Sequence, residues 1–397
     1  MAVGNNTVNC FHMVALIMFA FAIASLFRLD KGVNVVRLDK PIFSKAQQNA
    51  TENGCDLFSG RWIYDTSYPL YTEGNCSLIG DRFTCAKYGR KDLKYQNWRW
   101  QPHQCDLPRV NGTTLLKKLR NKKLIFVGDS LDRNQWRSLM CLIEPYLPPA
   151  TNKTLVSEGN LKKLYVEDYN ATIGFYWSPY LVESSADHVG ASAQPGLTVR
   201  INSIEKHARH WSDADILIFD TFLWWALKIE SIASISFHSP DAVYKKVESS
   251  QSPFEIALNT WSEWLEYRID RNKTKIFFTS SSPITVGETP WGTNLGCYNA
   301  TEPRADDMYW QNHRRDLMKV VESAIENLKE KGVKVDYLNI TQLSCYRQDA
   351  HLSVYTLRYK DVGFKLRNPA KSDCIHWCLP GVPDVWNQIL YAYIIKP

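Results

Sequence analysis

Four short apolar runs, separated by segments with helical periodicity, constrain the fold of this chain most strongly. The runs occupy 123–127 (KLIFV), 215–220 (DILIFD), 275–279 (KIFFT) and 333–338 (VKVDYL). Helical patterns cover 131–143, 253–269 and 306–331, the second opened by Ser252 and Pro253 and the third ended by Gly332. Strands that alternate with helices indicate an α/β fold, in which a parallel sheet is flanked by helices and ligands bind at the carboxyl ends of the strands.

The N-terminal region contains a candidate membrane span. Residues 11–27 form a 17-residue stretch without Lys, Arg, Asp or Glu, at the short end of the lengths that cross a bilayer. A cleaved signal peptide is the alternative, because 22–24 (AIA) fits a cleavage site. The basic residues that follow the span would by themselves place the rest of the chain in the cytoplasm: Arg28, Lys31, Arg37 and Lys40.

Glycosylation signals and cysteines argue for the opposite orientation. Asn-X-Ser/Thr acceptors begin at Asn49, Asn75, Asn111, Asn152, Asn170, Asn272, Asn299 and Asn339. The cysteines after the span are Cys55, Cys76, Cys85, Cys105, Cys141, Cys297, Cys345, Cys374 and Cys378, which suits an oxidising lumen. We therefore expect a cytosolic tail (1–10), a signal-anchor helix (11–29), a stem (30–54) and a lumenal remainder.

The lumenal part divides by composition into two regions. Residues 55–110 are rich in Cys and Trp and predict short strands and turns, cross-linked among Cys55, Cys76, Cys85 and Cys105 in one of three pairings. Residues 111–397 carry the α/β pattern. Cys141 is expected to be the unpaired cysteine, which leaves an even number of others.

A serine follows the first apolar run, within 127–136 (VGDSLDRNQW). Ser130 at a strand-to-helix turn would present its hydroxyl at the edge of the sheet, and backbone N–H groups that open the helix could stabilise an oxyanion. Gly128 permits a tight turn. The alternative is that Asp129 or Ser130 simply caps the helix.

A second motif lies near the C-terminus, at 373–381 (DCIHWCLPG). Asp373, three residues before His376, can orient its imidazole and support the imidazolium that forms when His376 takes a proton from a serine. A disulfide-ordered surface loop is the alternative. Cys374, His376 and Cys378 match no standard zinc spacing, so no metal is expected.

A strand-end serine followed late in the chain by Asp-X-X-His is the order found in SGNH/GDSL hydrolases. Over 55–397 the sequence resembles the plant trichome birefringence-like proteins, which have a PC-esterase domain. The resemblance rests on 55–62 (CDLFSGRW), 68–71 (YPLY), 98–102 (WRWQP), 128–136 and 373–384 (DCIHWCLPGVPD). Segments 202–207 (NSIEKH) and 219–225 (FDTFLWW) look like the xylan-acetylating members.

The resemblance implies an SGNH-like fold in a single-pass type II protein of the Golgi membrane. Such proteins transfer acetyl groups onto cell-wall polysaccharides, with Ser130 as nucleophile, His376 as base and Asp373 as the group that orients it. The resemblance implies an acetyl donor, with acetyl-CoA as one candidate, and no bound cofactor. The net charge of +6 is spread without a block of like charges, so no nucleic-acid partner is expected.

The remaining candidates for oxyanion or substrate binding are Gly128, Asp129, Arg133, Asp220, Trp224 and Trp225. Many relatives carry Asn at position 220; an amide donates to an oxyanion, whereas an ionised Asp would repel it. Asp220 is thus either structural or a contact for substrate hydroxyls. Arg133 is either an oxyanion donor or half of a buried ion pair with Asp132 or Asp220.

The aromatic residues, 14 Trp, 20 Tyr and 16 Phe, fit either a packed core or a polysaccharide cleft. If Trp224 and Trp225 lie on a strand, they point to opposite faces, so one would line the cleft. His207 and His210 are expected at the surface of a helix.

Three functions fit this sequence. The first is an O-acetyltransferase that works through an acetyl-serine intermediate, with the xylan backbone as the expected acceptor. An acetylesterase with the same residues would use water as acceptor. A non-catalytic wall-glycan binding protein would not need Ser130 at all.

Overall fold

The apolar runs form neighbouring strands of one sheet, which confirms the predicted α/β fold. The strand order is β12 (Val335–Leu338), β11 (Lys275–Thr279), β9 (Ile216–Asp220), β3 (Lys123–Gly128), β6 (Ala171–Trp177), β5 (Leu161–Val166) and β4 (Val156–Glu158). The first five strands are parallel, and β5 and β4 extend the sheet antiparallel. The sheet is therefore mixed, because the chain runs through β4, β5 and β6 by tight turns that reverse its direction.

The computed structural model describes residues 55–149, 151, 153–188, 197–228, 232–236, 252–284, 296–304 and 315–396. The predicted tail, anchor and stem lie outside these residues. None of the helices within the described ranges has the length and apolar character needed to cross a membrane.

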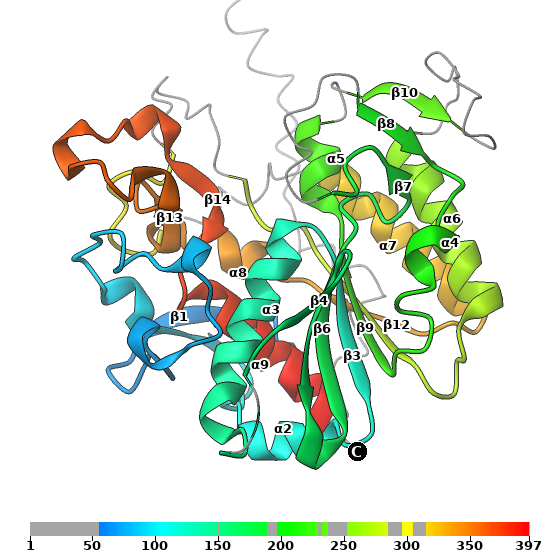
Figure 1. Cartoon of the computed structure of the whole chain (residues 1–397), viewed down its shortest axis with the longest axis horizontal. Coiled ribbons are helices and arrows are strands. Elements are labelled where there is room, and N and C mark those ends of the chain that lie inside the picture. Colours follow the sequence, from blue (N-terminus) through cyan, green and yellow to red (C-terminus); the bar gives the residue numbers. More distant parts are fainter. Residues whose placement is uncertain are drawn as a thin grey trace, which may run out of the picture. The chain divides into compact units, whose positions relative to one another are not determined.

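Helices cover both faces of the sheet (Figure 1). On one side lie α2 (Gly112–Lys118), α3 (Ser130–Ile143) and α9 (Val382–Ile395), and on the other α4 (Glu205–Ala208), α6 (Pro253–Arg268) and α7 (Arg315–Glu330). The residues predicted to begin and end two of these helices do so. The Ser252 hydroxyl accepts the N–H of Glu255 at the start of α6, and Gly332 follows α7 with a φ of 77°. Two short helices, α5 (Phe222–Lys228) and α8 (Thr341–Cys345), follow β9 and β12.

Smaller sheets lie around this core. In the Cys- and Trp-rich region, β1 (Gly60–Tyr64) pairs antiparallel with β2 (Trp98–Pro102), and short 3-10 turns connect them. Near the C-terminus, β13 (His351–Ser353) pairs antiparallel with β14 (Asp373–Trp377). A third small sheet has the order β10 (Ile232–Ser236), β8 (Leu197–Arg200) and β7 (Glu183–Ser184).

Four disulfides connect the described residues: Cys55–Cys105, Cys76–Cys141, Cys85–Cys378 and Cys297–Cys374. Only the first lies wholly within 55–110, so the prediction that four cysteines pair among themselves is wrong. The prediction that Cys141 is free is also wrong, because Cys141 lies on the part of α3 that packs against the Cys-rich region. The free cysteine of the described residues is the buried Cys345.

Candidate active site

Ser130 lies where β3 ends and α3 begins, at the predicted strand-to-helix turn. Asp129 is the N-cap of α3, and its side chain accepts the N–H of Leu131 at 2.8 Å. The capping alternative therefore applies to Asp129 and leaves the Ser130 hydroxyl for other partners. Gly128 must be glycine, because a Cβ there would overlap the carbonyl oxygen of Asp220 and a carboxylate oxygen of Asp132.

The structure brings Ser130, His376 and Asp373 together. His376 Nε2 lies 2.7 Å from Ser130 Oγ, and His376 Nδ1 lies 2.9 Å from Asp373 Oδ2. The other carboxylate oxygen of Asp373 accepts the N–H groups of Ile375 and His376 at 3.1 and 3.0 Å. Burial alone would raise the pKa of Asp373, but the imidazole and these N–H donors outweigh it and hold that pKa well below its usual range.

Asn134, which sequence reasoning passed over, fixes the strand that carries His376. Its Oδ1 accepts the N–H of Trp377 at 2.8 Å, and its Nδ2 donates to the Trp377 carbonyl oxygen at 3.3 Å. Asn134 lies one helical turn after Ser130 on α3 and is fully buried. One side chain thus couples the helix that begins at Ser130 to the strand that carries His376. The only signal in the sequence was the position of an amide four residues after the serine.

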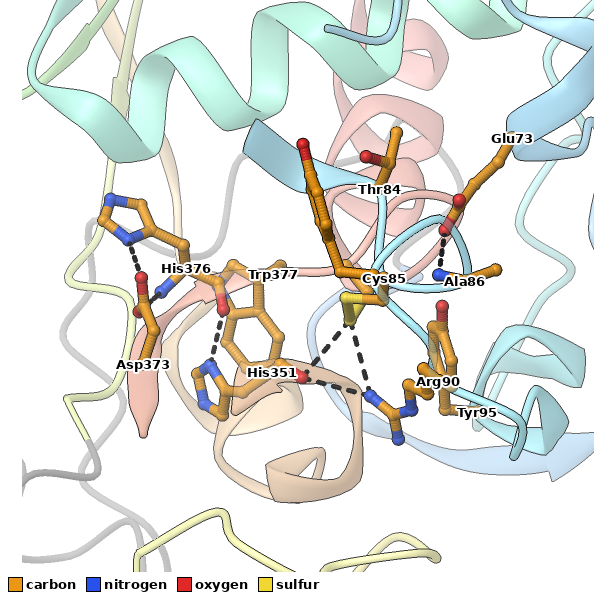
Figure 2. The surroundings of a disulfide bond; sticks show 12 residues. Glu73, Thr84, Cys85, Ala86, Arg90, Tyr95, His351, Asp373, His376 and Trp377 are labelled. Atoms are coloured by element: carbon orange, nitrogen blue, oxygen red, sulfur yellow. Dashed lines mark hydrogen bonds and ion pairs between the residues drawn. A yellow bond between two sulfur atoms is a disulfide. The ribbon is translucent and has the colours of Figure 1, made fainter. Parts of the chain in front are cut away.

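A buried histidine supports the same strand from behind (Figure 2). His351 Nδ1 lies 3.0 Å from the carbonyl oxygen of His376, and its ring stacks on Trp377 with centroids 3.8 Å apart. Because a carbonyl only accepts, Nδ1 carries the proton. Burial lowers the pKa of His351 to about 4, which keeps the ring neutral.

Disulfides also hold this strand. Cys374 bonds to Cys297 and Cys378 to Cys85, so both cysteines that flank His376 are cross-linked. They are disulfide partners in this structure rather than thiolates. Figure 2 shows the second of these bonds beside His351 and Arg90.

Buried hydrogen bonds connect two of the motifs on which the resemblance rests, 68–71 and 373–384. Asp384, at the start of α9, accepts the hydroxyls of Tyr71 at 2.8 Å and Ser138 at 2.5 Å and the N–H of Gly381 at 2.8 Å. Tyr71 comes from the Cys-rich region and Ser138 from α3. This contact fixes that region against the α/β core.

Three carboxyl groups are buried near the start of α3: Asp129, Asp132 and Asp220, each at most 2% exposed. Burial raises the pKa of Asp129 to about 7. Burial, reinforced by the nearby carboxylates, raises the pKa of Asp132 and of Asp220 well above the usual range. Asp220 Oδ1 accepts the N–H of Phe222 at 3.3 Å. Of the two alternatives for Asp220, this buried position at the end of β9 favours the structural one.

Arg133 does not form the ion pair with Asp132 or Asp220 that one alternative required. Its Nε is buried without a hydrogen-bond partner among the described residues, and its guanidinium carbon lies 5.7 Å from the ring centre of Trp177. Burial, followed by the charges of Arg82 and Arg137, lowers the pKa of Arg133 to about 10. The guanidinium keeps donors for a ligand.

Trp224 and Trp225 lie on helix α5, so the alternation of faces that a strand would impose on them does not apply. Trp225 is fully buried, and its Nε1 donates to the hydroxyl of Thr221 at 3.2 Å. Trp224, 9% exposed, packs edge-on against Trp177 and Tyr180. Most large aromatic side chains serve the core, and the fully buried tryptophans include Trp100, Trp136, Trp211, Trp225, Trp261, Trp377 and Trp386.

His207 was expected at the surface of a helix, and this prediction is wrong. His210, for which the same was expected, is partly exposed. His207 is fully buried. Its Nε2 lies 3.2 Å from Asp187 and its Nδ1 3.1 Å from the Tyr176 hydroxyl. These long-range polar partners make burial of the ring possible.

Comparison with known proteins adds two family matches. Residues 107–393 match the GDSL/SGNH-like acyl-esterase family found in Pmr5 and Cas1p, and residues 53–106 match the PMR5 N-terminal domain. Xylan O-acetyltransferase 14 of Oryza sativa subsp. japonica is 44% identical over 387 residues, 90% of this chain and 81% of that protein. Protein trichome birefringence-like 34 of Arabidopsis thaliana is 42% identical over 395 residues, 97% of this chain and 95% of that protein.

Proposed function

This chain belongs to the GDSL/SGNH-like acyl-esterase family found in Pmr5 and Cas1p, and we propose that it is a polysaccharide O-acetyltransferase that acts on the xylan backbone. The hydrogen-bonded series Ser130–His376–Asp373 carries this proposal. The relatives named as xylan O-acetyltransferases support the acceptor.

The first half-reaction forms an acetyl-serine. Ser130 Oγ attacks the carbonyl carbon of the acetyl donor while His376 Nε2 takes the hydroxyl proton. The tetrahedral intermediate then collapses, and the leaving group departs with the proton from His376. Asp373 holds the imidazole in the tautomer with Nδ1–H and stabilises its cation. Acetyl-CoA is one candidate donor, and no bound cofactor takes part.

The second half-reaction returns the acetyl group to a sugar. His376 takes the proton of a sugar hydroxyl, the sugar oxygen attacks the acetyl-serine, and Ser130 leaves with the proton from His376. Backbone N–H groups at the start of α3 and the guanidinium of Arg133 are the donors that would stabilise both oxyanions. Burial favours the neutral form of Asp220, which repels an oxyanion less than a carboxylate would.

Transfer requires that the sugar outcompete water for the acetyl-serine. The test incubates the full-length protein with an acetyl donor and xylo-oligosaccharides, manno-oligosaccharides or oligogalacturonides, and analyses the sugars by mass spectrometry. We expect acetylated xylo-oligosaccharide and no product with Ser130→Ala. Release of free acetate with every acceptor, without acetylated sugar, would instead identify an esterase. Product on another glycan alone would remove xylan from the proposal.

We further propose a single-pass type II protein of the Golgi membrane with residues 30–397 in the lumen. The uncharged stretch at 11–27 and the disulfides of the described residues support this location. Several acceptor asparagines are exposed, as glycosylation requires: Asn75, Asn111, Asn170, Asn272 and Asn299. Protease protection in sealed Golgi vesicles, with sensitivity to endoglycosidase, tests this. Digestion of the catalytic region in intact vesicles would contradict it.

A further inference from the structure

Three cationic side chains, Arg82, Arg358 and Lys371, gather beside Asp373. None of them forms an ion pair with any residue that the structure describes. Cations at a protein surface are ordinarily solvated singly or set against acidic neighbours. An unpaired group of them beside the active site therefore creates a local positive field.

These three cations line one cavity. Arg82, Arg358 and Lys371 surround a hollow of about 580 Å³ that reaches the catalytic Asp373, which is within the usual size of a ligand site. Its remaining lining combines apolar and hydroxyl side chains: Leu352, Thr356, Leu357, Ser372 and Ile375. Such a lining offers apolar surface to a sugar or an acyl chain and hydrogen bonds to its polar groups.

The only carboxylate in the cavity lining cannot neutralise this charge. Both oxygens of Asp373 already form hydrogen bonds, one to the His376 ring and the other to two backbone N–H groups. The cavity therefore offers an excess of positive charge to whatever enters it. Arginine presents paired N–H donors that fit a carboxylate or a phosphate.

We propose that Arg82, Arg358 and Lys371 form an anion subsite that binds an oxyanion group carried by one of the two substrates. This rests on the proposed acetyl transfer. Two sources supply the same chemistry: the carboxylate of a uronate substituent on the acceptor glycan, or a phosphate of the acetyl donor. The subsite would select the charged form of that substrate and place it next to the triad.

Binding to the full-length Ser130→Ala protein, measured by isothermal titration calorimetry, separates the two sources without turnover. One arm compares a xylo-oligosaccharide with the same oligosaccharide bearing one glucuronate. The other compares a neutral acetyl thioester with acetyl-CoA. We expect one charged ligand to bind at least about tenfold more tightly than its neutral counterpart at low salt, with this preference reduced at high salt.

The variants Arg82→Gln and Arg358→Gln should each remove most of that preference and leave the affinity for the neutral ligand unchanged. Arg268→Gln is the matched control, because it removes one exposed arginine from α6, across the sheet from α3. Unchanged thermal unfolding of the variants shows that they fold. Loss of preference for the glucuronate assigns the subsite to the acceptor, and loss for acetyl-CoA assigns it to the donor.

Two results would overturn the subsite: neither charged ligand is preferred over its neutral counterpart, or Arg268→Gln lowers the preference as much as Arg82→Gln. The proposed function is tested separately, by transfer from a neutral donor to a neutral acceptor with the Ser130-containing protein. Failure of transfer with intact anion preference refutes the reaction alone. Transfer without anion preference refutes the subsite alone.

Discussion

Substitution of Asn134 by alanine tests how much this one side chain contributes to the position of His376, the proposed base. The amide accepts the N–H of Trp377 at 2.8 Å and donates to its carbonyl at 3.3 Å. In Asn134→Ala both main-chain groups stay buried and lose their partners. Each such loss costs about 1–2 kcal/mol, so the free energy of unfolding should fall by about 2–4 kcal/mol.

The catalytic effect should exceed what lower stability explains. His376 immediately precedes Trp377, and its Nε2 lies 2.7 Å from Ser130 Oγ. Freed from α3, the strand can shift, and a displacement of about 1 Å at reacting groups lowers rates by about 100-fold. We expect kcat to fall by about that factor, well below the unfolding temperature, with little change in KM.

Gln135→Ala is the matched control for this substitution. Gln135 is also buried on α3, but its side chain donates to Asn387 of α9 at 3.3 Å and, within the described part of the chain, forms no hydrogen bond to the strand of His376. It should lose stability and keep kcat within about threefold. The account is refuted if Asn134→Ala unfolds more easily but keeps its kcat, or if Gln135→Ala loses kcat equally.

Three further predictions follow from the same structure. Asp373→Asn should lower kcat by about 10⁴ while the fold persists, because the imidazole loses its orienting acceptor; a loss under tenfold in steady-state kinetics would remove Asp373 from the triad. Burial raises the pKa of Asp384 to about 6, against about 3.9 when unfolded, so the native state holds the extra proton and the unfolding free energy falls as pH rises from 4 to 6. Urea denaturation of Asp384→Asn should show a flatter dependence over that window, and an unchanged slope would contradict it. Cys141→Ser opens the loop closed with Cys76, 65 residues apart, and should cost about 4 kcal/mol; equal stability would restore the expectation that Cys141 is free.

Local signals predicted much of the fold. The strand of Lys123–Gly128 is an apolar run closed by glycine, and α6 begins at a Ser-Pro pair, so each could be identified from a few adjacent residues. The order of a strand-end serine and a late Asp-X-X-His also identified the residues that the structure brings together. These features depend on neighbours in the sequence, which is why one sequence sufficed.

The errors arose where burial or pairing depends on distant residues. Cys141 was expected to be free because spacing does not specify a disulfide partner 65 residues away. His207 has charged neighbours in the sequence, which suggested an exposed position. It is buried in the structure, where Asp187 and Tyr176 lie within hydrogen-bond distance of its ring nitrogens. The apolar segment at Phe222–Lys228 fits either a strand or a short helix by periodicity, and the structure makes it a helix, so the argument from strand alternation did not apply to Trp224.

Detection of an acetyl group on Ser130 is the most direct test of the central claim, which is that this serine carries the acetyl group from donor to glycan. Full-length protein is mixed with an activated acetyl ester, quenched at intervals with and without xylo-oligosaccharide, and its peptides are examined by mass spectrometry. The account predicts an acetyl adduct on Ser130 that disappears faster with sugar present, while the sugar gains acetyl. An adduct lost at the same rate without sugar would identify an esterase. Acetylated sugar formed equally by Ser130→Ala, with no adduct in either protein, would contradict the mechanism.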